Sequence, residues 1–189
     1  RLPKKAPKTF ENFDFSLLKS RDLDWIRALP SLGAVYSHRN LAFIGPPGTG
    51  KTAIAKALPT ILSRMSKEEI IEISKIQSIA GILEEGLVTK RPFRSPHHTT
   101  TVTALTGGGI NPKPGEMTLA HGGVLYMDEF PEFSRAVMET LRQPLEDRKI
   151  VVSRANGTYS FPADFVLMAS MNPCRCGYYP DRNKCNCTE

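Results

Sequence analysis

The chain has 189 residues, of which 40% are hydrophobic and 23% are charged, and its formal net charge is +6. These values are ordinary for one globular domain that buries its own core. No apolar run approaches the roughly 20 residues that a membrane-spanning helix needs, and no signal-peptide pattern opens the chain. We therefore expect a cytoplasmic protein with no membrane partner, and the basic balance weakly indicates an anionic partner such as nucleic acid or a nucleotide.

Residues 1–40 are predicted to form an N-terminal arm and a short helix. The arm places Lys4, Lys5 and Lys8 among prolines, and a helical pattern over residues 21–29 stops at Pro30. Such an arm can contact nucleic acid phosphates, but a solvated terminus is the commoner explanation. Because the first residue is arginine rather than methionine, we expect a fragment of a longer protein.

A phosphate-binding loop is predicted directly after the arm. The apolar run at residues 41–44 predicts a buried parallel strand, and a helical pattern follows with Ile54 and Leu58 on one side. The residues between strand and helix match G-x-x-x-x-G-K-T and are Gly45, Pro46, Pro47, Gly48, Thr49, Gly50, Lys51 and Thr52. A strand, this loop and a helix in that order are the setting that supports nucleotide binding over an ordinary turn.

Backbone chemistry explains why these residue types bind phosphate. Gly48 and Gly50 have no side chain to block a phosphate and can aim successive N–H groups inward. Lys51 supplies a charge for the outer phosphates of ATP, and the hydroxyl of Thr52 is a ligand for Mg²⁺.

The middle of the chain alternates helical and extended patterns. Ser66 is predicted to cap a helix that ends near residue 79, and the two prolines in residues 91–98 predict an extended segment there. His97 and His98 are candidate metal ligands, although a surface or hydrogen-bonding role is favoured because adjacent histidines point in different directions.

Two polar strand ends are predicted to face the phosphate loop. An apolar strand at residues 123–127 ends in Asp128 and Glu129, which is a Walker B pattern. Asp128 is expected to hold the Mg²⁺ hydration shell, and Glu129 to orient and activate the attacking water. A second buried strand at residues 165–171 ends in Asn172, which is positioned to contact the γ-phosphate or that water, the role called sensor 1.

Between these strands, Ser134 is predicted to cap a helix reaching residue 145. Residues 149–154 and 158–161 flank Asn156-Gly157 and predict a β-hairpin. The hairpin is either a pore-facing projection or a plain edge hairpin.

Four cysteines close the chain as two C-x-C pairs: Cys174, Cys176, Cys185 and Cys187. They are a candidate tetrahedral zinc site, although the spacing is tighter than the usual C-x-x-C. Unligated thiols are the alternative, and disulfides are disfavoured in the cytoplasm.

From the phosphate loop onward the chain closely resembles the ComM/YifB family of magnesium-chelatase-like AAA+ ATPases. The segments that carry the resemblance are residues 45–52, 91–99, 107–109, 114–116, 119–121, 123–129, 132–133, 141–147, 153–157 and 171–174. The resemblance implies an α/β P-loop NTPase (AAA+) fold with a parallel central sheet, a helix-2 insert at residues 107–115 and a pre-sensor-1 β-hairpin at residues 149–161. It also implies a homo-hexamer and a role in DNA branch migration during natural transformation.

The ends of the chain depart from that family. Residues 1–45 are more similar to IstB-type transposition helper ATPases, which indicates a fused or recombined gene, or a joined gene model. The chain ends before the region where the family keeps its arginine finger, sensor 2 and helical lid, so we expect weak ATP turnover from this fragment. The expected division is an IstB-like arm and helix at residues 1–40, an AAA+ core at 41–173 and a cysteine-rich tail at 174–189 without a lid.

Three functions follow from these patterns. The first is an ATPase that uses ATP and Mg²⁺ to remodel DNA or migrate DNA branches. The second is an IstB-like ATP-dependent loader or transposition helper, and the third is a magnesium chelatase motor subunit. Arg135 and Arg142 are candidates to face a neighbouring subunit's nucleotide, with solvent exposure as the simpler alternative.

Overall fold

The computed structural model describes residues 24, 26, 29, 40–84, 86–109, 112–154, 157–177, 179, 181 and 183–187. The predicted arm and the helix at residues 21–29 fall almost wholly outside these residues. The helices are α3 (Lys51–Ala57), η3 (Leu58–Thr60), α4 (Lys67–Ala80), α5 (Val102–Thr106), α6 (Glu116–Leu119), η4 (Phe130–Glu132), α7 (Arg135–Thr140) and α8 (Arg142–Asp147). The strands are β1 (Leu41–Ile44), β2 (Phe93–Arg94), β3 (Gly107–Gly108), β4 (Lys113–Pro114), β5 (Val124–Met127), β6 (Lys149–Arg154), β7 (Gly157–Pro162) and β8 (Val166–Met171).

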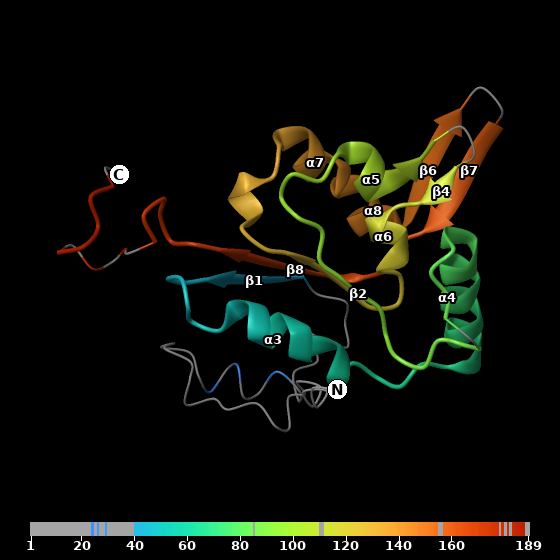
Figure 1. The fold of residues 1–189 in the computed structure, drawn as a ribbon, viewed down its shortest axis with the longest axis horizontal. Helices are drawn as coiled ribbons and strands as arrows, with labels where there is room; N and C mark the ends of the chain where they lie inside the picture. The colour runs from blue at the N-terminus through green and yellow to red at the C-terminus, as the bar shows by residue number, and fades with distance from the viewer. Residues whose placement is uncertain are drawn as a thin grey trace, which may run out of the picture.

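A four-stranded parallel sheet in the order β1-β8-β5-β2 forms the centre of the molecule. Helix α3 covers one face, and α5, α6, α7 and α8 cover the other (Figure 1). Strand β8 lies between β1 and β5, so the strand that precedes Asn172 is flanked by the strands that precede the phosphate loop and Asp128. The predicted parallel sheet is confirmed.

Each face of the sheet has its own apolar core. On β5, Val124 and Tyr126 belong to the core beneath α3, whereas Leu125 and Met127 belong to the core beneath α5–α8. All four residues are fully buried, because helices cover both faces, and this explains why the strand is a continuous apolar run. The outer strand β1 differs, since its Ile44 side chain is 65% exposed.

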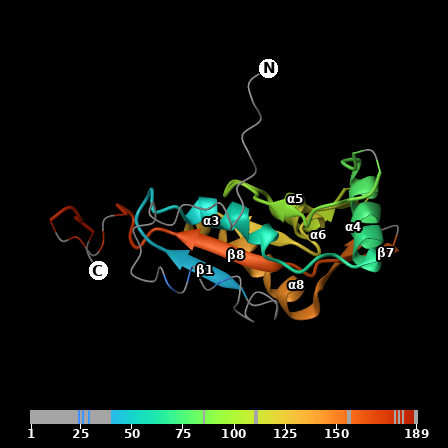
Figure 2. The same cartoon turned by 90° about the horizontal axis from the view of Figure 1, so that it is seen from below.

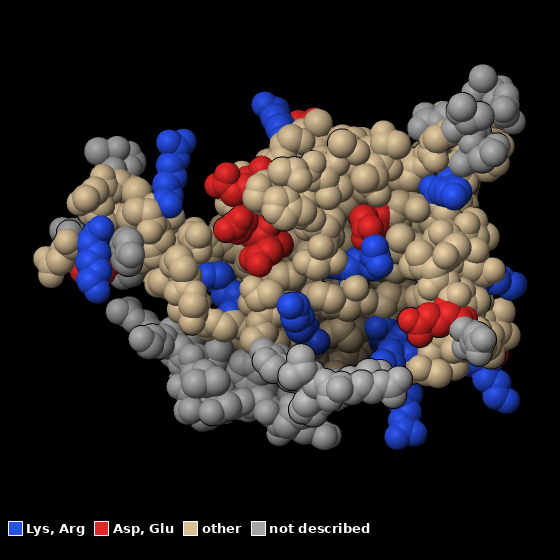
Figure 3. All heavy atoms as spheres, in the orientation of Figure 1, with Lys and Arg blue, Asp and Glu red and all other residues tan. Residues whose placement is uncertain are grey.

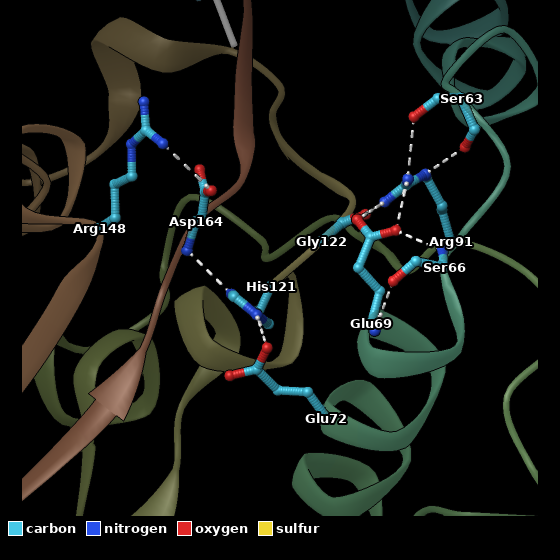
Figure 4. A network of polar contacts seen from close by, with 9 residues as sticks. All are labelled: Ser63, Ser66, Glu69, Glu72, Arg91, His121, Gly122, Arg148 and Asp164. Carbon is cyan, nitrogen blue, oxygen red and sulfur yellow. Dashed lines mark hydrogen bonds and ion pairs between the residues drawn. The ribbon is translucent and has the colours of Figure 1, made fainter. Parts of the chain in front are cut away.

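Helix α4 packs at the amino ends of the strands through a polar network centred on Arg91 (Figure 4). The guanidinium of Arg91 donates to Glu69 Oε1 at 3.0 Å and to the Gly122 carbonyl at 2.6 Å. Glu69 also accepts the backbone N–H of Ser66, while Ser66 Oγ accepts the N–H of Glu69, so the predicted cap is a complete capping box. The Arg91 side chain, only 9% exposed, therefore joins the start of α4 to the turn that precedes β5.

Two antiparallel hairpins project from this core. Strands β3 and β4 form the insert expected at residues 107–115, and β6 and β7 form the hairpin expected before β8. The insert requires glycine at its base, because a Cβ on Gly107 would lie 2.4 Å from the Lys113 carbonyl oxygen.

The prediction of one continuous helix from Ser134 to residue 145 is wrong, because the helix is interrupted. The structure has two helices, with α7 ending at Thr140 and α8 beginning at Arg142. Pro144 explains the break, since its ring clashes with the carbonyl four residues earlier, that of Thr140.

The two ends of the sheet carry different features. The strands point toward the cysteine-rich segment, whereas α4 lies at the opposite end (Figure 2). Within the described part of the chain, no helix is long and apolar enough to cross a membrane.

Candidate nucleotide site

The predicted phosphate loop runs from β1 into α3 with the backbone geometry that its glycines allow. Gly48 and Gly50 have φ values of 76° and 83°, in the left-handed region. The Gly50 carbonyl accepts the backbone N–H of Ile54 at 3.0 Å and so starts the helix. The N–H of Gly45 donates to the Met171 carbonyl at 3.2 Å, which fixes the start of the loop to the end of β8.

The side chain of Lys51 folds back across the phosphate loop to its first residues. Its Nζ donates to the carbonyl oxygens of Gly45 and Pro46 at 2.5 and 2.9 Å, and it lies 3.5 Å from Asn172 Oδ1. Burial lowers the pKa of Lys51, and the nearby carboxylate of Asp128 partly opposes that shift. The lysine and the predicted sensor residue therefore meet at the carboxyl end of β8.

Asp128 is held by a set of hydrogen-bond donors. Thr52 Oγ1 donates to Asp128 Oδ2 at 3.1 Å, while Ser170 Oγ and the N–H of Glu129 donate to Oδ1. Burial by itself would raise the pKa of Asp128, but the hydrogen bonds from Ser170, Tyr126, Thr52 and Glu129 hold this pKa below its ordinary value. The carboxylate is thus kept ionised and aimed at Thr52.

Sequence reasoning missed Tyr126 and Ser170. The Tyr126 hydroxyl lies 3.1 Å from Ser170 Oγ and 3.2 Å from Thr52 Oγ1. A polar residue inside each of two otherwise apolar strands was the available signal. The pairing of Tyr126 with Met168 places Asp128 level with Ser170, and that register is not visible in the sequence.

Glu129 lies at the rim of the site. Its backbone adopts a φ of 54°, which is unusual for a residue with a side chain, and its side chain is 54% exposed. His98 Nδ1 lies 3.5 Å from Glu129 Oε2, whereas His97 Nδ1 pairs with Thr99 Oγ1 at 2.9 Å. The hydrogen-bonding role favoured for the two histidines agrees with these contacts.

One cavity of about 500 Å³ brings most of the predicted nucleotide-site residues together, but Gly45 and Pro46 do not line it. Its lining comprises Pro47, Gly48, Thr49, Gly50, Lys51, Thr52, Ala53, Lys56, Asp128, Glu129, Ser170, Met171 and Asn172. A larger, mostly apolar cavity of about 750 Å³ lies between η3 and α4. Its lining contains no carboxylate and none of residues 45–52, so the chemistry of phosphate and metal binding points to the smaller cavity.

The oxygen pair formed by Thr52 and Asp128 fits a magnesium ion. Mg²⁺ takes oxygen ligands at 2.0–2.1 Å in an octahedron, whose edge is about 3 Å. The separation of Thr52 Oγ1 from Asp128 Oδ2, 3.1 Å, matches one such edge. These two residues would hold the ion.

The cysteines also come together. Their four sulfur atoms lie within 4.8 Å of one another, and all four thiols are free. The backbone N–H of Tyr179 donates to Cys174 Sγ, and this hydrogen bond, together with those from Cys176, Cys185 and Gly177, lowers the pKa of that thiol to about 6. The two C-x-C pairs thus form one cluster, beyond the carboxyl end of β8.

The parallel sheet, the glycine-rich loop and the acidic strand end define an α/β P-loop NTPase of the AAA+ class. The chain belongs to the family described as magnesium chelatase, subunit ChlI, whose sequence profile matches residues 27–189. The match begins before residue 45, where the ComM/YifB resemblance was expected to start. The IstB-like character of residues 1–45 stays a prediction.

Curated relatives agree with this family. The chain is 49% identical over 147 residues to competence protein ComM of Haemophilus influenzae, covering 77% of the chain and 29% of that protein. It is 46% and 45% identical over 148 residues to the YifB proteins of Salmonella typhimurium and Escherichia coli, with the same coverage. The chain therefore spans under a third of the length of these relatives.

Solved structures support the fold alone. The crystal structure of NtrX from Brucella abortus in complex with ADP has a TM-score of 0.54 and 22% sequence identity to the chain. The similarity covers 81% of this chain and 30% of NtrX.

Proposed function

We propose that the chain binds ATP with Mg²⁺ and hydrolyses it as an AAA+ module of the ComM/YifB type. The observation that carries this proposal is the convergence of Lys51, Thr52, Asp128 and Asn172 on one cavity beside the glycine-rich loop. Family membership agrees with it, because the profile of the family spans all four of these residues.

Each residue has a defined part in this reaction. Backbone N–H groups of residues 48–52 hold the phosphates, and Lys51 exchanges its loop carbonyls for phosphate oxygens. Thr52 and Asp128 hold Mg²⁺, which neutralises charge on the β- and γ-phosphates when bound. Glu129 accepts a proton from the attacking water, and Asn172 donates its amide N–H groups to the γ-phosphate or the water.

DNA is the proposed target of the ATP-driven work, in the form of remodelling or branch migration by a homo-hexamer. Support comes from the ComM relative and from the net charge of +6. On the face shown in Figure 3, lysine and arginine side chains are spread widely, and acidic side chains gather near its middle. The distribution of charge on this face therefore does not identify which residues would contact DNA.

The cytoplasmic location stays a prediction.

Measuring ATP turnover with different stimulants tests the target. Branched DNA is expected to raise turnover, whereas stimulation by a porphyrin with Mg²⁺ would favour a chelatase motor. A response to neither, with ATP-dependent retention of DNA, would favour the IstB-like loader.

The four cysteines form a separate candidate site, for Zn²⁺.

The Glu129→Gln variant tests the hydrolytic step. The amide cannot accept a proton, so we expect unchanged ATP affinity and at least a hundredfold loss of turnover. Fluorescent-nucleotide binding and phosphate release measure the two quantities. Glu139→Gln, at an exposed position on α7, is the matched control and should keep both. Full turnover in Glu129→Gln would remove the assigned role.

A further inference from the structure

The cysteine cluster has the arrangement of a single metal site. Cys174 Sγ lies 3.3 Å from Cys176 Sγ and 3.7 Å from Cys185 Sγ, and the last two sulfurs are 3.5 Å apart. Cys187 completes the group within 4.8 Å. Sulfurs contributed by two short segments thus surround a common point.

These separations distinguish a metal site from a disulfide. A disulfide would place two sulfurs about 2.05 Å apart, well below every separation in the cluster. Four thiolates at about 2.3 Å from one zinc ion lie about 3.8 Å from each other, because they occupy the corners of a tetrahedron. Sulfur ligands favour Zn²⁺ over the hard ions Mg²⁺ and Ca²⁺.

The first C-x-C pair also touches the phosphate loop. Gly177, which ends the turn after Cys176, donates its N–H to the Cys174 carbonyl at 3.0 Å. A Cβ on Gly177 would lie 2.8 Å from Pro47 Cδ, so this turn packs directly on the loop. A displacement of this turn would therefore change its contact with Pro47 in the phosphate loop.

The same segment borders the predicted catalytic residues. Cys174 and Arg175 line a cavity of about 400 Å³ together with Glu129 and Asn172. Glu129 and Asn172 also line the cavity of the phosphate loop. Only Pro173 separates Asn172 from the first cysteine.

We propose that Cys174, Cys176, Cys185 and Cys187 bind one Zn²⁺, and that the ion holds residues 174–177 against the phosphate loop so that zinc loading sets nucleotide affinity. The zinc site stands on the cysteine geometry alone. Its effect on nucleotide rests on the proposed ATP site.

Metal analysis of the purified protein tests the site itself. We expect one zinc per chain after dialysis, and Co²⁺ exchanged into the site should show the visible bands of tetrahedral thiolate coordination. Cys176→Ser and Cys185→Ser should lose the metal. Asn186→Ser, an exposed position between the second pair of cysteines, is the matched control and should keep it. Chains that carry no zinc, bound iron with sulfide, or a disulfide detected by mass would each overturn the proposal.

Nucleotide binding tests the coupling. Zinc-loaded protein and protein stripped of zinc under reducing conditions are titrated with a fluorescent ATP analogue after the chelator is removed and Mg²⁺ is added. We expect the stripped protein to bind about tenfold more weakly, because misplacing a positioning element by about 1 Å has large effects. Gly177→Ala should keep zinc and show a similar loss.

The two parts of the proposal fail separately. Equal nucleotide affinity with and without zinc would overturn the coupling and leave the metal site in place. If neither form binds nucleotide, the proposed ATP site fails and the coupling with it, whereas metal content still decides the zinc site.

Discussion

Asp128 depends for its orientation on neighbours that lie far from it in the sequence. Ser170 and Thr52 each donate a hydroxyl to a different carboxylate oxygen, and the Tyr126 hydroxyl lies within 3.2 Å of both donors. This arrangement fixes the plane of the carboxylate. The oxygen shared with Thr52 therefore faces the cavity in which Mg²⁺ is proposed to bind.

Ser170→Ala should weaken the use of Mg²⁺. A hydrogen bond to a charged group contributes about 1.5–3 kcal/mol, so the Mg²⁺ concentration that half-saturates ATP turnover should rise about tenfold or more. The pKa of Asp128 should rise toward its ordinary value, because one of the donors that lower it is lost. Magnesium titrations of turnover measure the effect. Ser160→Ala, exposed on β7, is the control and should leave the titration unchanged.

The adjacent histidines offer an internal comparison at the rim of the site. His98 faces Glu129, whereas His97 pairs with Thr99. We expect His98→Ala to reduce turnover about tenfold with little change in ATP affinity, because the proposed base loses the group that orients it. His97→Ala should retain turnover. If both variants lose activity equally, orientation of Glu129 by His98 is not the cause.

At the scale of secondary-structure elements, the β3–β4 insert depends on close backbone contact at its base. Gly107 has a φ of 89°, and a Cβ added at this position would lie only 2.4 Å from the backbone carbonyl oxygen of Lys113. Gly86 has the same φ, but no described atom lies within 4 Å of its Cβ position. The pair therefore compares two glycines of positive φ that differ in the space around their Cβ positions.

Gly107→Ala should therefore destabilise the protein more than Gly86→Ala. At φ 89° and ψ 175°, Gly107 adopts a backbone conformation that is essentially restricted to glycine and costs another residue about 1–3 kcal/mol, and we expect the clash to bring the Gly107→Ala cost to about 3 kcal/mol or more. Urea unfolding at a constant m-value measures the difference. Equal losses of unfolding free energy would show that the insert relaxes around an added methyl group.

Local sequence signals predicted many elements and part of the site. The glycine pattern at residues 45–52, the acidic end of β5 and the turn signal of the β6–β7 hairpin all depend on neighbouring residues alone. The break at Thr140 was readable in principle, because Pro144 acts four residues upstream.

Other features depend on contacts between distant segments and were not predictable in the same way. Ser170 meets Asp128 through the register of β5 and β8, and Arg91 reaches Glu69 and Gly122 only after α4 docks. The convergence of the two C-x-C pairs likewise depends on the turn between them. Sequence spacing offered the cysteines as candidates but could not place them beside Pro47.

At the scale of the whole molecule, charged side chains do different things at the two ends of the parallel sheet: they line a cavity at one end and join a helix to the sheet at the other. The carboxyl ends bring Lys51, Asp128 and Asn172 to a cavity, as parallel sheets generally do for ligands. The amino ends are closed by the Arg91 network, which joins α4 to the sheet. Ionisable groups at both ends have shifted pKa values, so the stability of the molecule should depend on pH.

Glu69 and Asp128 determine the direction of that dependence. Burial acts to raise the pKa of Glu69, but hydrogen bonds from the Ser66 N–H and Arg91, with the nearby charge of Arg91, lower this pKa below its ordinary value near 4.5. The pKa of Asp128 is also lowered. Because both carboxylates bind protons less readily in the folded state, their stabilisation is present above the unfolded pKa values and is lost as the pH falls through the folded ones.

We therefore expect the free energy of unfolding to fall steadily on acidification from about pH 5 to about pH 3. Glu69→Gln should lower stability at neutral pH and flatten this slope, since the amide keeps the shape of the side chain but does not titrate. Denaturant melts at a series of pH values measure both effects. Glu139→Gln, whose carboxylate pairs with Arg135 on the exposed surface of α7, should retain the slope. If Glu69→Gln and the unmodified chain lose stability in parallel over this range, the Arg91 network does not contribute to the acid sensitivity.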